Sequence, residues 1–77
     1  MFKVSVLDIQ TASIIFQGKA SSVILPGEEG ELSVLDFHQS IISCLKDGMI
    51  RIDNTPIAIK RGIARMQGEE LCILVER

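Results

Sequence analysis

The side chains that could do chemistry in this chain gather between residues 27 and 48. Three glutamates, Glu28, Glu29 and Glu31, lie in or beside a glycine-flanked turn, and the only histidine, His38, follows in the next loop. Nucleophilic catalysis needs a base beside the nucleophile and a group that orients the base. Serines and a cysteine lie near His38 in sequence, but such proximity is common by chance. We therefore expect no catalytic residue.

The glycine-flanked turn also argues against phosphate chemistry and a bound cofactor. Gly27 and Gly30 enclose acidic residues, which repel phosphate, and the chain has no G-x-x-x-x-G-K-[ST] loop. Water at the tip of a turn should keep both enclosed glutamates ordinary carboxylates. Swinging-arm carrier domains hold their cofactor on a hairpin lysine, and Lys46 stands beside an Asp-Gly turn. Its surroundings do not otherwise match that motif, so we expect no cofactor.

The two cysteines, Cys44 and Cys72, sit among β-branched or aliphatic neighbours. Thiols in such surroundings usually behave as small apolar residues of the core. We expect both to be buried and free, because disulfides are rare in a reducing compartment. Two cysteines and one histidine do not complete a zinc site, which needs three or four protein ligands, so we expect no metal.

Length and charge narrow the function classes further. The chain has 77 residues, which is typical of one domain, here residues 1–77. Its net charge of −2 works against nucleic-acid binding, which favours a basic face. No apolar run approaches the roughly 18 residues of a membrane span, and the N-terminus lacks the pattern of a secretory signal. We expect any membrane association to occur only through other proteins.

Short apolar runs separated by turn residues predict strands along the whole chain. We expect an all-β fold, an antiparallel β-sandwich of about nine to ten short strands in two sheets. Gly18 should end one strand, and Pro26 should end another because proline lacks the N–H that a ladder needs. The expected strands cover residues 2–6, 14–16, 19–25, 31–35, 41–45, 49–53, 57–60, 63–66 and 71–75.

Four segments, taken in order, resemble a known family. Phe16-Gln17-Gly18 followed by Val23 is similar to an F-x-G-x-x-x-x-V opening, and residues 27–32 resemble a G-x-x-G-E-[LIF] turn. Residues 45–52 resemble an L-K-x-G-x-[IL]-R-[IV] strand, and residues 62–75 resemble the closing strands of the same domain. That domain is the N-terminal β-sandwich of the epsilon subunit of F-type ATP synthase. The ordered set spans nearly the whole chain.

The resemblance implies a non-catalytic rotor subunit of the central stalk. Such a subunit links the gamma subunit to the c-ring and supports the coupling of proton flow to ATP synthesis. Glu31 matches the family's turn glutamate and His38 its loop histidine, and both are expected to face the c-ring at one tip, with Glu28 and Glu29 beside them. The protein would then be peripheral on the energy-transducing membrane, on the cytoplasmic side in a bacterium.

The chain departs from the family in its histidine loop. The family pattern P-G-H-A-P-L is replaced by Asp-Phe-His-Gln-Ser-Ile at residues 36–41. We expect the contact with gamma near this loop, at Leu35, Phe37, Ile41 and Ile42, although Phe37 could equally pack on the edge of the sandwich.

Most members of the family continue into a two-helix C-terminal domain that inhibits ATP hydrolysis, whereas this chain stops at Arg77. Inhibition is therefore not assigned to it. The alternative interpretation is a free-standing β-sandwich module that binds another protein through its acidic hairpin tip.

Overall fold

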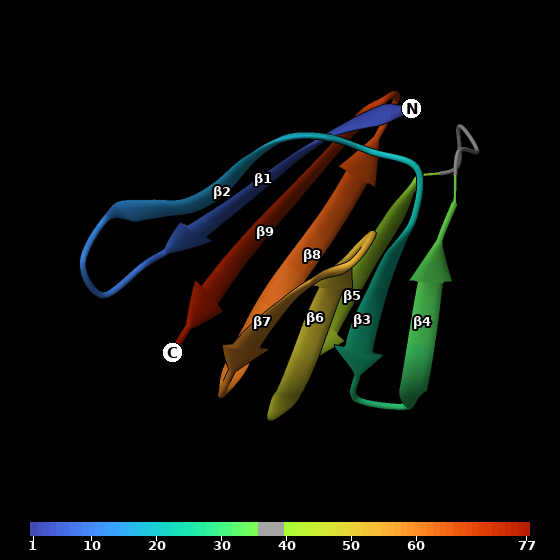
Figure 1. The fold of residues 1–77 in the computed structure, drawn as a ribbon. Coiled ribbons are helices and arrows are strands. Elements are labelled where there is room, and N and C mark those ends of the chain that lie inside the picture. The colour runs from blue at the N-terminus through green and yellow to red at the C-terminus, as the bar shows by residue number, and fades with distance from the viewer. Residues whose placement is uncertain (36–39) are drawn as a thin grey trace.

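The computed structural model describes residues 1–35 and 40–77, and nine strands lie within them (Figure 1). The described residues contain no helix, and therefore none that could cross a membrane. The all-β fold expected from the turn spacing is confirmed. The strands are β1 (Phe2–Asp8), β2 (Ser13–Ala20), β3 (Val23–Gly27), β4 (Gly30–Val34), β5 (Ile41–Leu45), β6 (Gly48–Ile52), β7 (Thr55–Ile59), β8 (Arg61–Gln67) and β9 (Glu70–Glu76).

The strands form one path that bends into two halves. Its order is β2-β1-β9-β8-β5-β3-β6-β7, and β4 pairs with β3 off this path. The bend lies between β5 and β3, where Gly27 and Leu45 are Cα partners. Strands β2, β1, β9, β8 and β5 make a five-stranded half, and β7, β6, β3 and β4 make a four-stranded half. Figure 1 shows the four-stranded half folded over the other, as in a sandwich.

The core lies between the two halves and takes every second residue of most strands. In β1 the side chains of Phe2, Val4 and Val6 are buried, and in β9 those of Leu71, Ile73 and Val75. The four-stranded half adds Leu25, Ile50, Ile52 and others to the same cluster. Alternation of this kind gives each strand one face on the core and one outer face. From here on, "outer face" means the side of the five-stranded half that points away from this core.

One strand pair departs from the expected antiparallel arrangement. β1 runs parallel to β9, and Val6 is the partner of Ile73 in that pairing. The backbone N–H of Lys3 donates to the carbonyl of Glu69 at 2.7 Å, and that of Ile9 donates to the carbonyl of Val75 at 3.0 Å. Parallel partners are not joined by a short hairpin. No turn residue in the sequence therefore signals this pairing.

Two expected strand ends are wrong. β2 runs through Gly18, which pairs with Val4. A Cβ added at Gly18 would lie 3.6 Å from the ring of Phe16. β3 runs through Pro26, because its ladder contact uses a carbonyl rather than an N–H. The carbonyl of Pro26 accepts the backbone N–H of Lys46 at 2.9 Å.

The expected strand over residues 19–25 is interrupted at Ser21 and Ser22. The side chain of Asp53 stabilises this interruption. Oδ1 of Asp53 accepts the backbone N–H of Ser21 at 3.2 Å and that of Ser22 at 3.1 Å. The backbone N–H of Asp53 in turn donates to the carbonyl of Ser22 at 2.8 Å. Asp53 has a φ of 52°, a left-handed conformation that aspartate tolerates better than most residues. It thereby fixes the β6–β7 turn against the passage from β2 to β3.

Candidate functional site

The acidic turn predicted from the sequence is a two-residue connection between β3 and β4. Glu28 and Glu29 lie between Gly27 and Gly30, which are Cα partners. A Cβ on Gly27 would come within 2.7 Å of the carbonyl oxygen of Gly30, so no larger residue fits without a backbone shift. Gly30 has a φ of 134°, which favours glycine. Glycine at both ends is therefore a requirement of this turn.

Two backbone hydrogen bonds fix this turn to β5. The N–H of Glu28 donates to the carbonyl of Cys44 at 3.1 Å, and the N–H of Lys46 donates to the carbonyl of Pro26 at 2.9 Å. These bonds flank the bend between the two halves, where Gly27 pairs with Leu45. The turn is thus tied to both halves of the fold.

The three carboxylates of the turn are all exposed, and they border a hollow. Glu28, Glu29 and Glu31 line a hollow of about 430 Å³ together with residues from β5. The β5 residues are Ile42, Ser43 and Cys44, and Gly27, Gly30 and Leu32 complete the lining. Ile42 is 72% exposed, the highest fraction among the exposed large apolar side chains. The site therefore combines carboxylates with one strongly exposed aliphatic residue.

The remaining predicted site residues lie elsewhere or outside the described residues. Phe37 and His38 fall in residues 36–39, which are outside the described part of the chain. Leu35, before that segment, follows the end of β4 opposite the acidic turn, and Ser40, after it, precedes β5, whose other end pairs with Gly27 through Leu45. The five residues of β4 span roughly 17 Å. The acidic turn and the flanks of the histidine loop therefore do not share one tip.

The predicted gamma contacts differ in how much surface they offer. Leu35 is 45% exposed and Ile42 is 72% exposed, whereas Ile41 is partly buried and packs against the core. Leu35 and Ile42 are thus the described members of that set with free apolar surface.

The cysteines are not buried as expected. Cys44 and Cys72 are both free and exposed. Each occupies an outward position of its strand, since its neighbours Leu45, Leu71 and Ile73 point into the core. Among the described residues no group of three or more His, Cys, Asp or Glu side chains is placed to hold a metal ion.

Sequence reasoning missed an apolar row on the outer face, which crosses five strands. Successive Cα partners across β5, β8, β9, β1 and β2 are Cys44, Ile63, Leu74, Leu7 and Ile14. All but Leu7 are exposed, and Leu7 is half-buried. A bulge between Val6 and Leu7 leaves Ile15 without a partner and thereby brings Ile14 opposite Leu7. We call these five residues the apolar row.

One sequence signal could have pointed to the apolar row. Residues 71–75 form a continuous apolar run, and such a run indicates a strand that is covered on both faces. Because the other members of the row come from four other strands, β5, β8, β1 and β2, the complete row is visible only once the register is known.

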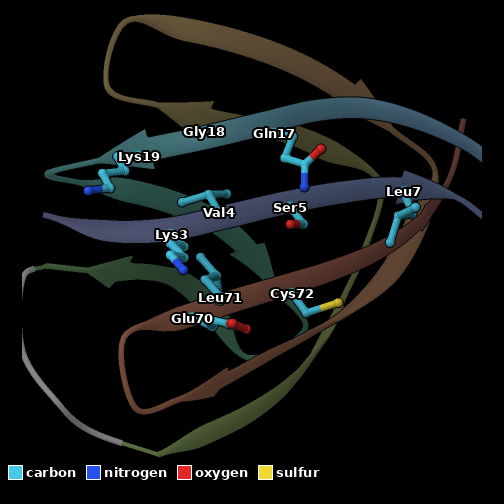
Figure 2. Close-up of a pocket in the computed structure, with 10 residues that line it drawn as sticks. All are labelled: Lys3, Val4, Ser5, Leu7, Gln17, Gly18, Lys19, Glu70, Leu71 and Cys72. Atoms are coloured by element: carbon cyan, nitrogen blue, oxygen red, sulfur yellow. The ribbon is translucent and has the colours of Figure 1, made fainter.

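The rows that border the apolar row on the outer face hold both polar and apolar side chains, among them Ile42, which is 72% exposed. On one side, Ile42, Arg65, Cys72, Ser5 and Gln17 form the next row, followed by Gln67, Glu70, Lys3 and Lys19. A hollow of about 560 Å³ lies over β2, β1 and β9 in this region. Figure 2 shows Lys3 and Lys19 toward one end of it and Leu7 at the other. On the opposite side of the apolar row, Arg61 and Glu76 form an ion pair at 2.9 Å.

Comparison with known proteins adds a family to this geometry. The family model described as "ATP synthase, Delta/Epsilon chain, beta-sandwich domain" matches residues 2–77. ATP synthase epsilon chains of Campylobacter jejuni are 40% identical to this chain over 68 residues, covering 82% of this chain and 53% of the relative. The epsilon chain of Sulfurimonas denitrificans is 38% identical over 76 residues, covering 91% and 58%. The chain thus spans about half the length of these curated relatives.

Solved structures share the fold. A chain in the Euglena gracilis mitochondrial ATP synthase structure (OSCP/F1/c-ring) superimposes with a TM-score of 0.80 at 17% identity, covering 100% of this chain and 52% of that one. A chain in the Tetrahymena thermophila central stalk/c-ring structure gives 0.74 at 13% identity, covering 97% and 63%. At these identities the likeness establishes the fold alone.

Proposed function

Because the chain belongs to the delta/epsilon chain family of ATP synthase and corresponds to its β-sandwich domain, we propose that it is a non-catalytic subunit of the central stalk. It joins a gamma subunit to the c-ring and supports the coupling of proton flow to ATP synthesis. It has no active site of its own in this role. Its attachment to the energy-transducing membrane is through the complex, on the cytoplasmic side in a bacterium.

The observation that carries this proposal is the attachment of the acidic turn. A subunit that transmits torque needs a contact point that does not move relative to its scaffold. The N–H of Glu28 and the carbonyl of Pro26 bind the turn region to β5 and to the connection that follows it. The turn therefore presents its carboxylates from a backbone held by β5 and the connection after it, besides its own hairpin.

We assign the c-ring contact to Glu31, with Glu28 and Glu29 beside it. All three side chains are exposed at one end of the fold. Arginine–carboxylate pairs add geometric specificity as well as energy, so an arginine in a polar loop of the c-ring is the expected partner of Glu31. His38 lies outside the described residues, and we assign it no contact here.

We assign the gamma contact to Leu35, which follows β4, and to Ile42 of β5. They supply exposed aliphatic surface, with exposed fractions of 45% and 72%. Leu35 lies beyond the end of β4 opposite the acidic turn, whereas Ile42 also borders the hollow beside the three carboxylates.

Co-expression with the gamma subunit of the same organism tests this function. The expected result is a one-to-one complex that survives size-exclusion chromatography. If the two chains elute separately at micromolar concentration, the stalk function is contradicted. The free-standing protein-binding module would then be the better interpretation.

A further inference from the structure

We propose that Gly48 is a positioning residue for the acidic turn, and that it acts on Glu31 through the ring of Pro26. Glu31 makes the contact with the c-ring in the proposed function, and this inference rests on that function. Gly48 and Pro26 need not touch the c-ring themselves. Their packing sets the direction in which β3 enters the turn, and thereby the place from which the carboxylate is presented.

Strands β5 and β6 lie on the same edge of β3, and the chain between them passes Pro26. Val23 pairs with both β4 and β6, and Gly27 pairs with both β4 and β5, so β4 has one edge of β3 to itself. On the other edge, β3 advances three residues from Ile24 to Gly27, whereas the facing chain advances six from Leu45 to Arg51. The extra residues form a bulge opposite Pro26, and a bulge bends the strand that carries it.

The bulge can lie this close to β3 only because residue 48 has no side chain. A Cβ added at Gly48 would lie 2.8 Å from Cβ of Pro26 and 3.3 Å from its Cγ. Carbon atoms attract each other at about 3.5–4.0 Å, so a Cβ there forces one of the two chains to move. The proline ring cannot rotate away, because it is closed onto its own backbone. Gly48 is not among the glycines with a positive φ, so its neighbour rather than its own backbone requires glycine.

Pro26 joins this contact to the proposed c-ring residue. Pro26 and Glu31 are Cα partners in the β3–β4 ladder. The side chains of directly opposite residues share one face of a sheet, with Cβ atoms about 4.5–5.5 Å apart. Pro26 therefore has Glu31 on one edge of β3 and Gly48 on the other. A displacement of Pro26 by a side chain at position 48 is directed toward the strand that carries Glu31.

The acidic turn has little freedom to absorb such a displacement. Only Glu28 and Glu29 separate the paired glycines, and Gly27 already lies so close to Gly30 that a Cβ on it would come within 2.7 Å of the Gly30 carbonyl oxygen. The carbonyl of Pro26 also accepts the N–H of Lys46 at 2.9 Å, which holds Pro26 against the bulge. A shift at Pro26 should therefore move the whole turn rather than distort one bond in it.

Binding of the detergent-solubilised c-ring to Gly48→Ala tests the inference. We expect this variant to bind at least about fivefold more weakly than the wild-type chain. Gly18→Ala is the matched control, because its Cβ would meet the nearest ring atom at an ordinary 3.6 Å, and it should change the affinity by less than about twofold. Ile73→Ala controls for lost stability, because Ile73 is buried in β9 and belongs to no strand of the acidic hairpin. While folded, it should bind the c-ring as the wild-type chain does.

Substitutions at Pro26 separate positioning from a general structural defect. Pro26→Gly removes both atoms that a Cβ at position 48 would meet, whereas Pro26→Ala keeps the nearer one. In the Pro26→Gly background, Gly48→Ala should therefore change c-ring affinity by less than about twofold. In the Pro26→Ala background it should still weaken binding, because the 2.8 Å approach remains. The same loss in all three backgrounds would overturn the proposed route through Pro26.

Amide resonances of the unbound chain report on the turn without any partner. Gly48→Ala should shift the amide signals of Glu28, Glu29 and Glu31 in a ¹H–¹⁵N correlation spectrum, and the Pro26→Gly background should abolish these shifts. Gly18→Ala should leave the three signals in place. Unchanged turn signals in Gly48→Ala would overturn the inference.

The two assays distinguish failure of this inference from failure of the proposed function. If the wild-type chain binds the c-ring and Gly48→Ala binds it equally well, the positioning role is overturned and the stalk function stands. If the wild-type chain does not bind the c-ring at all, the proposed c-ring contact fails, and the positioning role fails with it.

Discussion

The backbone N–H of Glu28 donates to the carbonyl oxygen of Cys44 at 3.1 Å, and this bond joins the acidic turn to β5. Glu28 belongs to the hairpin of the four-stranded half, whereas Cys44 lies in the five-stranded half and its side chain is part of the apolar row. The proposed c-ring contact and the apolar row therefore meet at one hydrogen bond. A force applied at the turn passes directly to the strand on which the apolar row begins.

The close approach of Gly27 and Gly30 predicts a cost for any side chain at position 27. In Gly27→Ala the new Cβ would come within 2.7 Å of the Gly30 carbonyl oxygen, so the backbone must shift. We expect the free energy of unfolding to fall by about 1–3 kcal/mol in a urea titration. Gly18→Ala is the control, because its Cβ would meet Phe16 at an ordinary 3.6 Å. Equal stability of the two variants would show that the turn is looser than its geometry indicates.

The hydrogen bonds that Asp53 accepts from the backbone of Ser21 and Ser22 predict different results for two substitutions. Asp53→Ala removes the acceptor of the Ser21 and Ser22 N–H groups and places alanine at a φ of 52°. We expect a loss of about 1–3 kcal/mol in unfolding free energy. Asp53→Asn keeps an acceptor oxygen and tolerates the left-handed conformation, so it should retain most of the stability. If the asparagine variant is as unstable as the alanine variant, these hydrogen bonds do not stabilise the fold.

Two adjacent residues of β9 lie on opposite faces of the sheet, and this predicts different costs for their truncation. Ile73 is 0% exposed, whereas Leu74 is 37% exposed and lies on the outer face. Ile73→Ala should lower the free energy of unfolding by about 2–5 kcal/mol, and Leu74→Ala by less than about 1 kcal/mol. Chemical denaturation of the isolated chain measures both values. A reversed order would mean that the register of β9 is shifted by one residue.

The two cysteines give a direct test of the same register. Cys44 and Cys72 are exposed, so both thiols should react with a maleimide in the native protein without denaturant. Mass spectrometry of each labelled peptide follows the two reactions separately. Labelling that appears only in urea would contradict the outward position of that residue.

Local signals in the sequence predicted most of the strands, and they failed where the structure depends on distant partners. Gly27 and Gly30 marked the β3–β4 hairpin, because both glycines are required by the turn itself. Pro26 and Gly18 suggested strand ends, yet their neighbours in other strands keep both in the sheet. The burial of Cys44 and Cys72 was expected from apolar neighbours in sequence, but the side of a strand depends on its register.

In the candidate site, too, local features could be predicted from the sequence and features that depend on distant partners could not. The carboxylates of Glu28, Glu29 and Glu31 could be proposed from sequence because one turn holds them together. The apolar row could not, because its members come from β5, β8, β9, β1 and β2, and the parallel pairing of β1 with β9 completes it. That pairing has no hairpin to reveal it.

The role of Glu31 predicts a loss of c-ring binding without a loss of stability. Its side chain is exposed, so Glu31→Ala should change the free energy of unfolding by less than about 0.5 kcal/mol. The loss of a charged hydrogen bond should weaken c-ring binding roughly tenfold. Glu70→Ala, an exposed glutamate at the start of β9, is the control for charge alone. Unchanged c-ring binding by Glu31→Ala would show that another residue makes this contact.

A bridging assay tests the central claim most directly. Immobilised gamma subunit is mixed with detergent-solubilised c-ring, with and without this chain, and the retained c-ring is quantified. The stalk function predicts that the c-ring is retained when the wild-type chain is present and that little is retained without it. Retention that is the same with and without the chain would contradict the account.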